Sequence, residues 1–132
     1  MINLYFYLRA NGKWIQDSHF TWLLLNTDDN YTTGWIGFDY LVDLGENLLK
    51  TSINNTGQWQ PQQNVTIINS ENNELHFSIS YQFLQIDSRQ IQLQFKWFSA
   101  DVLYTMDPLK FIDKGDAAPN DRFTYTYATE SN

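Results

Sequence analysis

The chain has 132 residues, of which 42% are hydrophobic, and this is enough for one domain with its own core. Its net charge is −7, and its eight Lys and Arg residues form no cluster of the kind that nucleic-acid binding needs. It has no Cys, and no apolar run approaches the roughly 20 residues of a membrane span. We therefore expect a single module over residues 1–132 with no disulfide, no nucleic-acid partner and no membrane insertion.

The first part of the chain shows apolar residues at every second position, which predicts β-strands. The first expected strand, Ile2–Leu8, carries Tyr5 and Tyr7 on its less apolar face. The second, Phe20–Leu25, is apolar on both faces, as expected of a central strand that is covered on both sides.

A polar loop and a third strand are expected next. Residues 26–34 are dense in turn-forming side chains. The third strand, Trp35–Val42, alternates again, and the pattern predicts Phe38, Tyr40 and Val42 on one face and Asp39 on the other.

The second half of the chain predicts more short strands. Residues 48–53 fit a short edge strand, and 54–64 fit a polar loop with Trp59 at its centre. Further strands are expected at 65–68, 75–80, 91–97 and 123–127, with a helical turn at 81–84 or 106–111. About eight or nine short strands separated by turns predict an all-β fold, a two-sheet antiparallel β-sandwich of jelly-roll or immunoglobulin-like type.

Motifs for catalysis are missing from the sequence. It has no Gly-x-Ser-x-Gly elbow, no phosphate-binding glycine loop, no His-Glu-x-x-His and no Cys nucleophile. His76 falls on the polar face of its strand, where a solvated surface role is expected. Asp39 and Asp116 are the more notable acids, but turn or strand-edge roles are favoured for both. We expect a protein that is not an enzyme, and a small sandwich lyase or hydrolase is the least favoured alternative.

The loop after the second strand comes closest to a metal-binding motif. Asn26, Asp28 and Asn30 alternate, and oxygen ligands two residues apart in a tight loop can surround a hard cation such as calcium. The pattern lacks the downstream bidentate Glu of an EF-hand. Two hypotheses therefore stand for this loop: a structural calcium ion, and an Asx-rich turn whose side chains hydrogen-bond to their own backbone. The turn is the favoured one.

Aromatic residues make up 17% of the chain, and sugars stack their C–H faces on Trp and Tyr rings. Three Trp residues stand in polar loop or strand-edge contexts and are candidate ligand platforms, with packing at the edge of the core as the alternative: Trp14, Trp35 and Trp59. Tyr5 and Tyr7 are weaker candidates. Four other aromatic residues lie in apolar strands and are expected in the core: Trp22, Phe38, Phe95 and Trp97.

Several stretches of the sequence resemble a known group of sandwich modules. The segments are Trp22–Asn30 with Thr33–Tyr40, and later Phe95–Trp97 and Gly115–Tyr125. Together they resemble family-nine carbohydrate-binding modules, which are attached to bacterial glycoside hydrolases and related secreted proteins. The likeness runs over most of the chain, and its matched motifs are scaffold strands and a turn.

The resemblance implies a β-sandwich that is not itself an enzyme. In family-nine modules two Trp rings clamp a terminal sugar and bound calcium supports the loops, but the matched motifs assign that clamp to no residue here. Asn26 stands where related loops often carry Asp.

The expected function is a non-catalytic module that recognises a polysaccharide or its chain end and is attached to a secreted glycoside hydrolase. The expected partners are a polysaccharide or oligosaccharide and the attached catalytic domain, outside the cell or on a bacterial cell surface. The alternative is a structural accessory domain that packs against a catalytic domain without sugar affinity. Because a strand-like segment starts directly after Met1, we expect a module excised from a larger protein.

Overall fold

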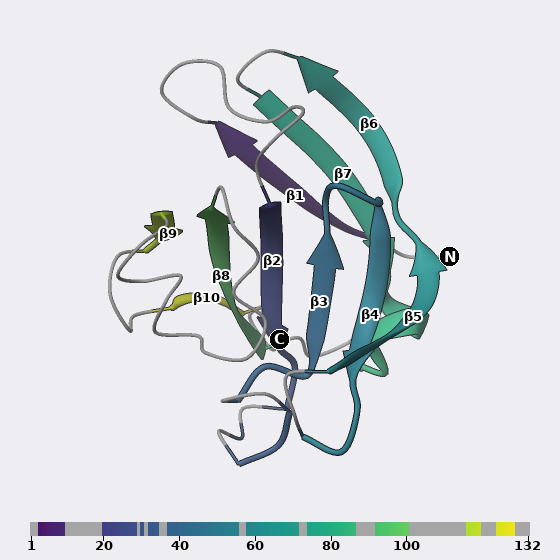
Figure 1. The fold of residues 1–132 in the computed structure, drawn as a ribbon, viewed down its shortest axis with the longest axis vertical. Coiled ribbons are helices and arrows are strands. Elements are labelled where there is room, and N and C mark those ends of the chain that lie inside the picture. Colours follow the sequence, from purple (N-terminus) through teal and green to yellow (C-terminus); the bar gives the residue numbers. More distant parts are fainter. Residues whose placement is uncertain are drawn as a thin grey trace.

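The structure is a computed structural model that describes residues 3–9, 20–28, 30, 32–34, 37–55, 58–71, 74–86, 92–100, 116–119 and 124–128. Within these ranges the chain forms two antiparallel sheets, which confirms the predicted all-β fold (Figure 1). Trp14, Trp35 and the second expected helical turn, 106–111, lie outside the described residues.

The smaller sheet has the strand order β1-β7-β6, and its strands are β1 (Asn3–Arg9), β6 (Thr66–Glu71) and β7 (Glu74–Ser80). The larger sheet has the order β10-β8-β2-β3-β4-β5, with β9 paired to β8. Its strands are β2 (Phe20–Asn26), β3 (Tyr40–Asp43), β4 (Leu48–Ser52), β5 (Trp59–Asn64), β8 (Gln92–Ala100), β9 (Asp116–Ala118) and β10 (Tyr125–Ala128). In Figure 1 the strands of the smaller sheet cross those of the larger one obliquely.

The main hydrophobic core lies between the two sheets. Leu23 and Leu25 of β2 face it from the larger sheet, and Phe6 of β1 and Phe77 of β7 face it from the smaller one. Phe6 and Phe77 stack at 5.5 Å between ring centroids. The predicted core positions Phe95 and Trp97 also belong here, Trp97 buried and Phe95 partly buried against it. The alternating apolar residues of β1 and β8 therefore face the main core, as the sequence predicts.

The larger sheet buries side chains on its outer face as well. We call this second group the outer cluster: Trp22, Leu24, Phe38, Leu41 and Phe98, with Trp59 packed against it. Because Leu23 and Leu25 face the main core while Trp22 and Leu24 face the outer cluster, β2 is covered on both sides, as its unbroken apolar run predicts.

Lys96 lies on the outer face of β8 and is only 2% exposed. Its Nζ donates to the carbonyl oxygen of Pro119 at 2.5 Å and lies 5.7 Å from the centre of the Phe98 ring. The sequence pattern places Lys96 on a polar face, but in the structure this face of β8 is buried at Lys96 and Phe98. A sequence pattern cannot show this, because the covering segment comes from elsewhere in the chain.

The third expected strand is shorter than predicted. Strand β3 begins at Tyr40, and Gly37, with φ of 94°, precedes it. Phe38 belongs to the outer cluster, whereas Tyr40 and Val42 face the main core, so the predicted common face of these three residues is wrong. Phe38 lies before the first residue of β3, so the period-two alternation of the strand does not extend to it.

The segment from residue 48 to residue 64 corrects two further predictions. Strand β4 lies between β3 and β5 and is not an edge strand. Residues 59–64, expected to be loop, form β5, the last strand in the order of the larger sheet. Pro61 pairs with Lys50 next to a register shift, and proline is tolerated in such an edge strand because the missing N–H donor can face outward.

The predicted helical turn at Tyr81–Leu84 is confirmed as α1, which follows β7 directly and ends at Gln85 in a left-handed conformation. No helix in the described ranges has the length and apolar character required to cross a membrane.

Candidate functional site

The outer face of the smaller sheet presents two exposed tyrosine rings. Tyr5 and Tyr7 lie two positions apart on β1, so they share one face, and they are 62% and 55% exposed. His76 of β7 pairs with Tyr7 across the sheet. We call Tyr5, Tyr7 and His76 the tyrosine strip.

Contacts within the tyrosine strip hold both rings. The His76 ring lies 6.0 Å from the Tyr5 ring and 6.3 Å from the Tyr7 ring, between centroids. A hydrogen bond to the Glu74 carboxylate raises the pKa of the Tyr7 hydroxyl, with further contributions from desolvation and from the Glu74 charge. Rings held in this way lose little conformational entropy when a ligand stacks on them.

The flanks of the tyrosine strip are polar. Arg9 pairs directly with Glu74 across the sheet, which places opposite charges side by side at one end. Ser78 and Ser80 of β7 pair with Tyr5 and Asn3 of β1, but both serines are buried. Aromatic rings beside charged side chains make a surface suited to a ligand that has both apolar faces and hydroxyls.

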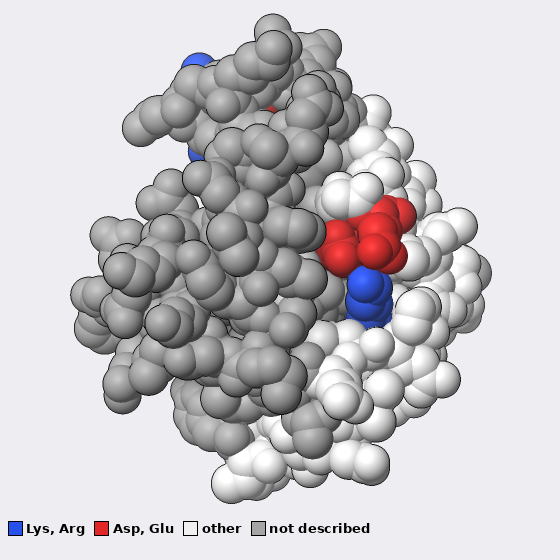
Figure 2. Space-filling view, in the orientation of Figure 1, with Lys and Arg blue, Asp and Glu red and all other residues white. Residues whose placement is uncertain are grey.

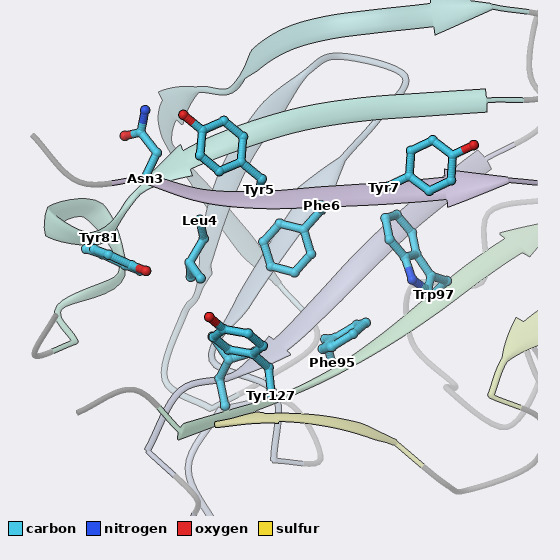
Figure 3. Close-up of a pocket in the computed structure, with 10 residues that line it drawn as sticks. Asn3, Leu4, Tyr5, Phe6, Tyr7, Tyr81, Phe95, Trp97 and Tyr127 are labelled. Carbon is cyan, nitrogen blue, oxygen red and sulfur yellow. The ribbon is translucent and has the colours of Figure 1, made fainter. Parts of the chain in front are cut away.

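A cavity of about 290 Å³ lies on the other side of β1, between the two sheets (Figure 3). We call it the aromatic cleft, and it is lined by Asn3, Leu4, Tyr5, Phe6, Tyr7, Tyr81, Leu93, Phe95, Trp97 and Tyr127. Figure 3 shows Leu4 and Phe6 directed toward it from β1, and the Tyr5 and Tyr7 rings on the opposite side of that strand. The two surfaces therefore lie on opposite sides of β1, and Tyr5 and Tyr7 contribute atoms to both.

The loop between β2 and β3 contains a half-buried carboxylate. Asp39 accepts hydrogen bonds from the Thr27 backbone N–H and the Thr33 hydroxyl, each at 3.0 Å. Burial raises the pKa of Asp39, the nearby Asp28 carboxylate raises it further, and the hydrogen bonds from Thr27 and Thr33 lower it. The Thr33 hydroxyl also lies within hydrogen-bonding distance of the Asp28 carboxylate. The single hydrogen of the Thr33 hydroxyl can serve only one of the two acids at a time, whereas Asp39 also accepts from the Thr27 hydroxyl at 3.4 Å.

The three candidate calcium ligands occupy different environments. Asn26 is 1% exposed in β2, and its amide has no hydrogen-bond partner within the described parts of the chain. Asp28 and Asn30 are exposed, and each accepts a hydrogen bond from the backbone N–H two residues later, at 3.0 and 2.9 Å. These are the Asx turns of the alternative interpretation. Among the described residues no group of three or more His, Cys, Asp or Glu side chains is arranged to hold a metal ion.

Of the three candidate platforms, Trp59 is the one in the described residues. It begins β5, is partly buried and packs against the outer cluster. This placement fits the alternative of packing at the edge of the core. Trp14 and Trp35 remain candidates whose surroundings lie outside the described ranges.

The structure adds site residues that sequence reasoning ranked low or missed. Tyr5 and Tyr7 were weaker candidates in the sequence, and His76 was expected to be an ordinary surface residue. Tyr81 and Tyr127 were not singled out, because α1 and β10 come together at the aromatic cleft only in the folded chain. The alternation of β1 is the one sequence signal that locates the strip, since it places Tyr5 and Tyr7 opposite the core face.

Lys50 lies beside two acidic side chains on the described surface. Lys50 lies 3.2 Å from Asp43 and 3.5 Å from Glu46. On the face seen in Figure 2, acidic and basic atoms stand in contact in one small group among uncharged atoms. This view shows no extended charged patch among the described residues.

Comparison with known proteins adds no relative: no protein-family description, no curated protein and no solved structure matches this chain.

Proposed function

We propose that this chain is a non-catalytic carbohydrate-binding module that recognises a polysaccharide or its chain end through exposed aromatic side chains. The tyrosine strip is the observation that carries the proposal. Tyr5 and Tyr7 lie on one strand face, are mostly exposed and both contact the His76 ring. Large aromatic rings that are exposed to solvent favour a binding role, and polar neighbours suit a hydroxyl-rich ligand.

The charge of the chain favours an uncharged polysaccharide over an acidic one. The net charge is −7, so a polyanion such as a polyuronate would be repelled during its approach. In this proposal the module belongs to a larger secreted protein, outside the cell or on a bacterial cell surface, and directs an attached glycoside hydrolase to its substrate. Trp14, Trp35 and Trp59 remain further candidates for ligand contact. In the 26–30 loop the Asx turns are favoured, and a calcium ion is kept as the alternative.

A structural accessory domain is the second candidate, because the same exposed tyrosines would also suit a neighbouring protein surface. In that case the tyrosine strip would be covered by an attached catalytic domain, and the isolated chain would bind no polysaccharide. The two functions therefore differ in a direct binding experiment.

Affinity electrophoresis through gels that contain soluble polysaccharides tests the proposal. We expect xylan, mixed-linkage β-glucan or galactomannan to retard the unmodified chain, and alginate not to do so. The double variant Tyr5→Ala, Tyr7→Ala should bind about tenfold or more weakly, because aromatic anchors dominate such contacts.

Ile68→Ala is the matched control, because Ile68 is a 49% exposed hydrophobic residue of β6 in the same sheet. It should leave retardation unchanged. Equal retardation of the double variant and the unmodified chain would disprove the assignment to the tyrosine strip. Failure of every polysaccharide to retard the unmodified chain would favour the accessory role.

A further inference from the structure

We propose that the aromatic cleft is a second binding site, which takes a single uncharged pyranose ring. The site lies between the sheets, on the opposite side of β1 from the Tyr5 and Tyr7 rings. It does not require polysaccharide binding by the tyrosine strip, so each proposal stands or fails by itself.

The volume of the cleft sets the size of its ligand. At about 290 Å³ it lies at the lower limit of small-molecule sites, which span about 300–1,000 Å³. One sugar ring is of a suitable size, whereas a length of polysaccharide would have to remain largely outside. The expected ligand is therefore a monosaccharide unit, either free or at the end or branch of a chain.

The walls of the cleft are aromatic and already in place. Phe6 and Phe95 meet edge to face at 5.7 Å between centroids, which joins the two sheets across the cleft. Trp97 is 6% exposed and meets Phe77 edge to face at 6.1 Å. Rings fixed by such contacts offer an apolar surface for the C–H face of a sugar at small entropic cost.

Polar groups gather at one end of the same cleft. Figure 3 shows the hydroxyl groups of Tyr81, from α1, and Tyr127, from β10, directed toward that end. Burial raises the pKa of Tyr81, and the Tyr127 hydroxyl raises it further, so the Tyr81 phenol remains a neutral donor and acceptor. Tyr127 is 43% exposed, so water can bond its hydroxyl when no ligand is present. A sugar hydroxyl can replace that water, whereas an apolar ligand cannot.

The lining also determines the charge of the ligand. None of the ten lining residues is Asp, Glu, Lys, Arg or His. A charged ligand would lose hydration inside the cleft without gaining an opposite charge. Aromatic walls, two phenol hydroxyls and an uncharged lining together select a neutral sugar over a sugar acid, a sugar phosphate or a hydrocarbon.

An NMR titration of the ¹⁵N-labelled full chain tests the site. The probes are methyl glucoside, methyl galactoside and methyl xyloside, with glucuronate and p-cresol as the charged and apolar comparisons. We expect at least one methyl glycoside to shift the backbone signals of Leu4, Leu93 and Phe95, and glucuronate to leave them unchanged. No shift with any of the three glycosides overturns the proposal, and so does a response to p-cresol or glucuronate alone.

Single hydroxyl deletions assign the polar end of the cleft. Tyr81→Phe and Tyr127→Phe should each weaken glycoside binding by about 2- to 10-fold, the usual effect of one hydrogen bond. Tyr125→Phe is the matched control, because Tyr125 lies on the same strand as Tyr127 and does not line the cleft. This variant should bind the glycoside with the same affinity as the unmodified chain. Equal affinities in all three variants would overturn the assigned role of the two hydroxyls.

Discussion

The outer faces of the two sheets differ, although both sheets share one core. The outer face of the larger sheet carries a second buried group, in which Trp22 and Leu24 are 3% and 0% exposed. The outer face of the smaller sheet presents Tyr5 and Tyr7 to solvent at 62% and 55%. The contrast separates two placements of aromatic residues: on one sheet they are buried in a cluster that stabilises the fold, and on the other they are exposed to solvent.

The largest expected effect comes from truncating one residue on each outer face. Leu24→Ala should lower the free energy of unfolding by about 2–5 kcal/mol, because it leaves a cavity in the outer cluster. Tyr5→Ala should change it by no more than about 0.5 kcal/mol, since the Tyr5 ring is mostly solvated. Urea unfolding followed by circular dichroism measures both values. Similar losses in the two variants would remove the contrast between the faces.

A smaller effect is expected where the β2–β3 loop meets the outer cluster. Gly34 has φ of 73°, and a Cβ atom there would lie 2.0 Å from the carbonyl oxygen of Phe38. Gly34→Ala should therefore cost about 1–3 kcal/mol of unfolding free energy through backbone strain and displacement of Phe38.

Gly45→Ala is the control for that variant. The nearest atom to an added Cβ at Gly45 is the Asp43 Oδ1, at 3.3 Å. The change should stay within about 0.5 kcal/mol in the same urea experiment. If Gly34→Ala proves as mild as the control, the loop does not constrain the covered face.

The smallest effect is expected in the pH dependence of stability. Because burial raises the folded pKa of Asp39 above its ordinary value of 3.8, the folded chain holds this proton more tightly than the unfolded chain does. The associated stabilisation is complete below the unfolded pKa and is lost as pH rises through the folded pKa. Asp39→Asn should remove this loss, so the stability of the variant relative to the unmodified chain should increase over that window.

Urea unfolding at several values between about pH 3 and pH 7 measures this difference. Parallel pH profiles for the variant and the unmodified chain would contradict the assignment to Asp39.

Repeating the series with calcium in place of EDTA tests the proposed metal. Since Asp28 and Asn30 already accept backbone hydrogen bonds, we expect equal stabilities in the two buffers. A rise with calcium would mean that these oxygens exchange their donors for the ion.

The sequence by itself determined the strands whose side chains alternate or are apolar throughout. It predicted β1, β2, β7 and β8, because each follows from the spacing of its own apolar residues. It placed a helical turn at α1 or at 106–111, without a periodic pattern to choose between them. It misassigned β5, a polar strand that contains Pro61, because that strand is stabilised by pairing with β4 and not by burial of its own residues. It ranked Trp14, Trp35 and Trp59 above Tyr5 and Tyr7 as ligand platforms, because the type of a residue does not tell how exposed its side chain is.

Tertiary structure alone decided which faces are covered and which residues meet. Lys96 is buried although it lies on a polar face in the sequence. Its hydrogen-bond partner Pro119 is 23 residues away, so the local pattern gives no sign of this burial. Tyr81 and Tyr127 line one cleft with Phe6 although they come from three distant segments. The physical reason is that local periodicity fixes the side of a strand on which a residue lies, whereas burial and ligand access depend on long-range packing.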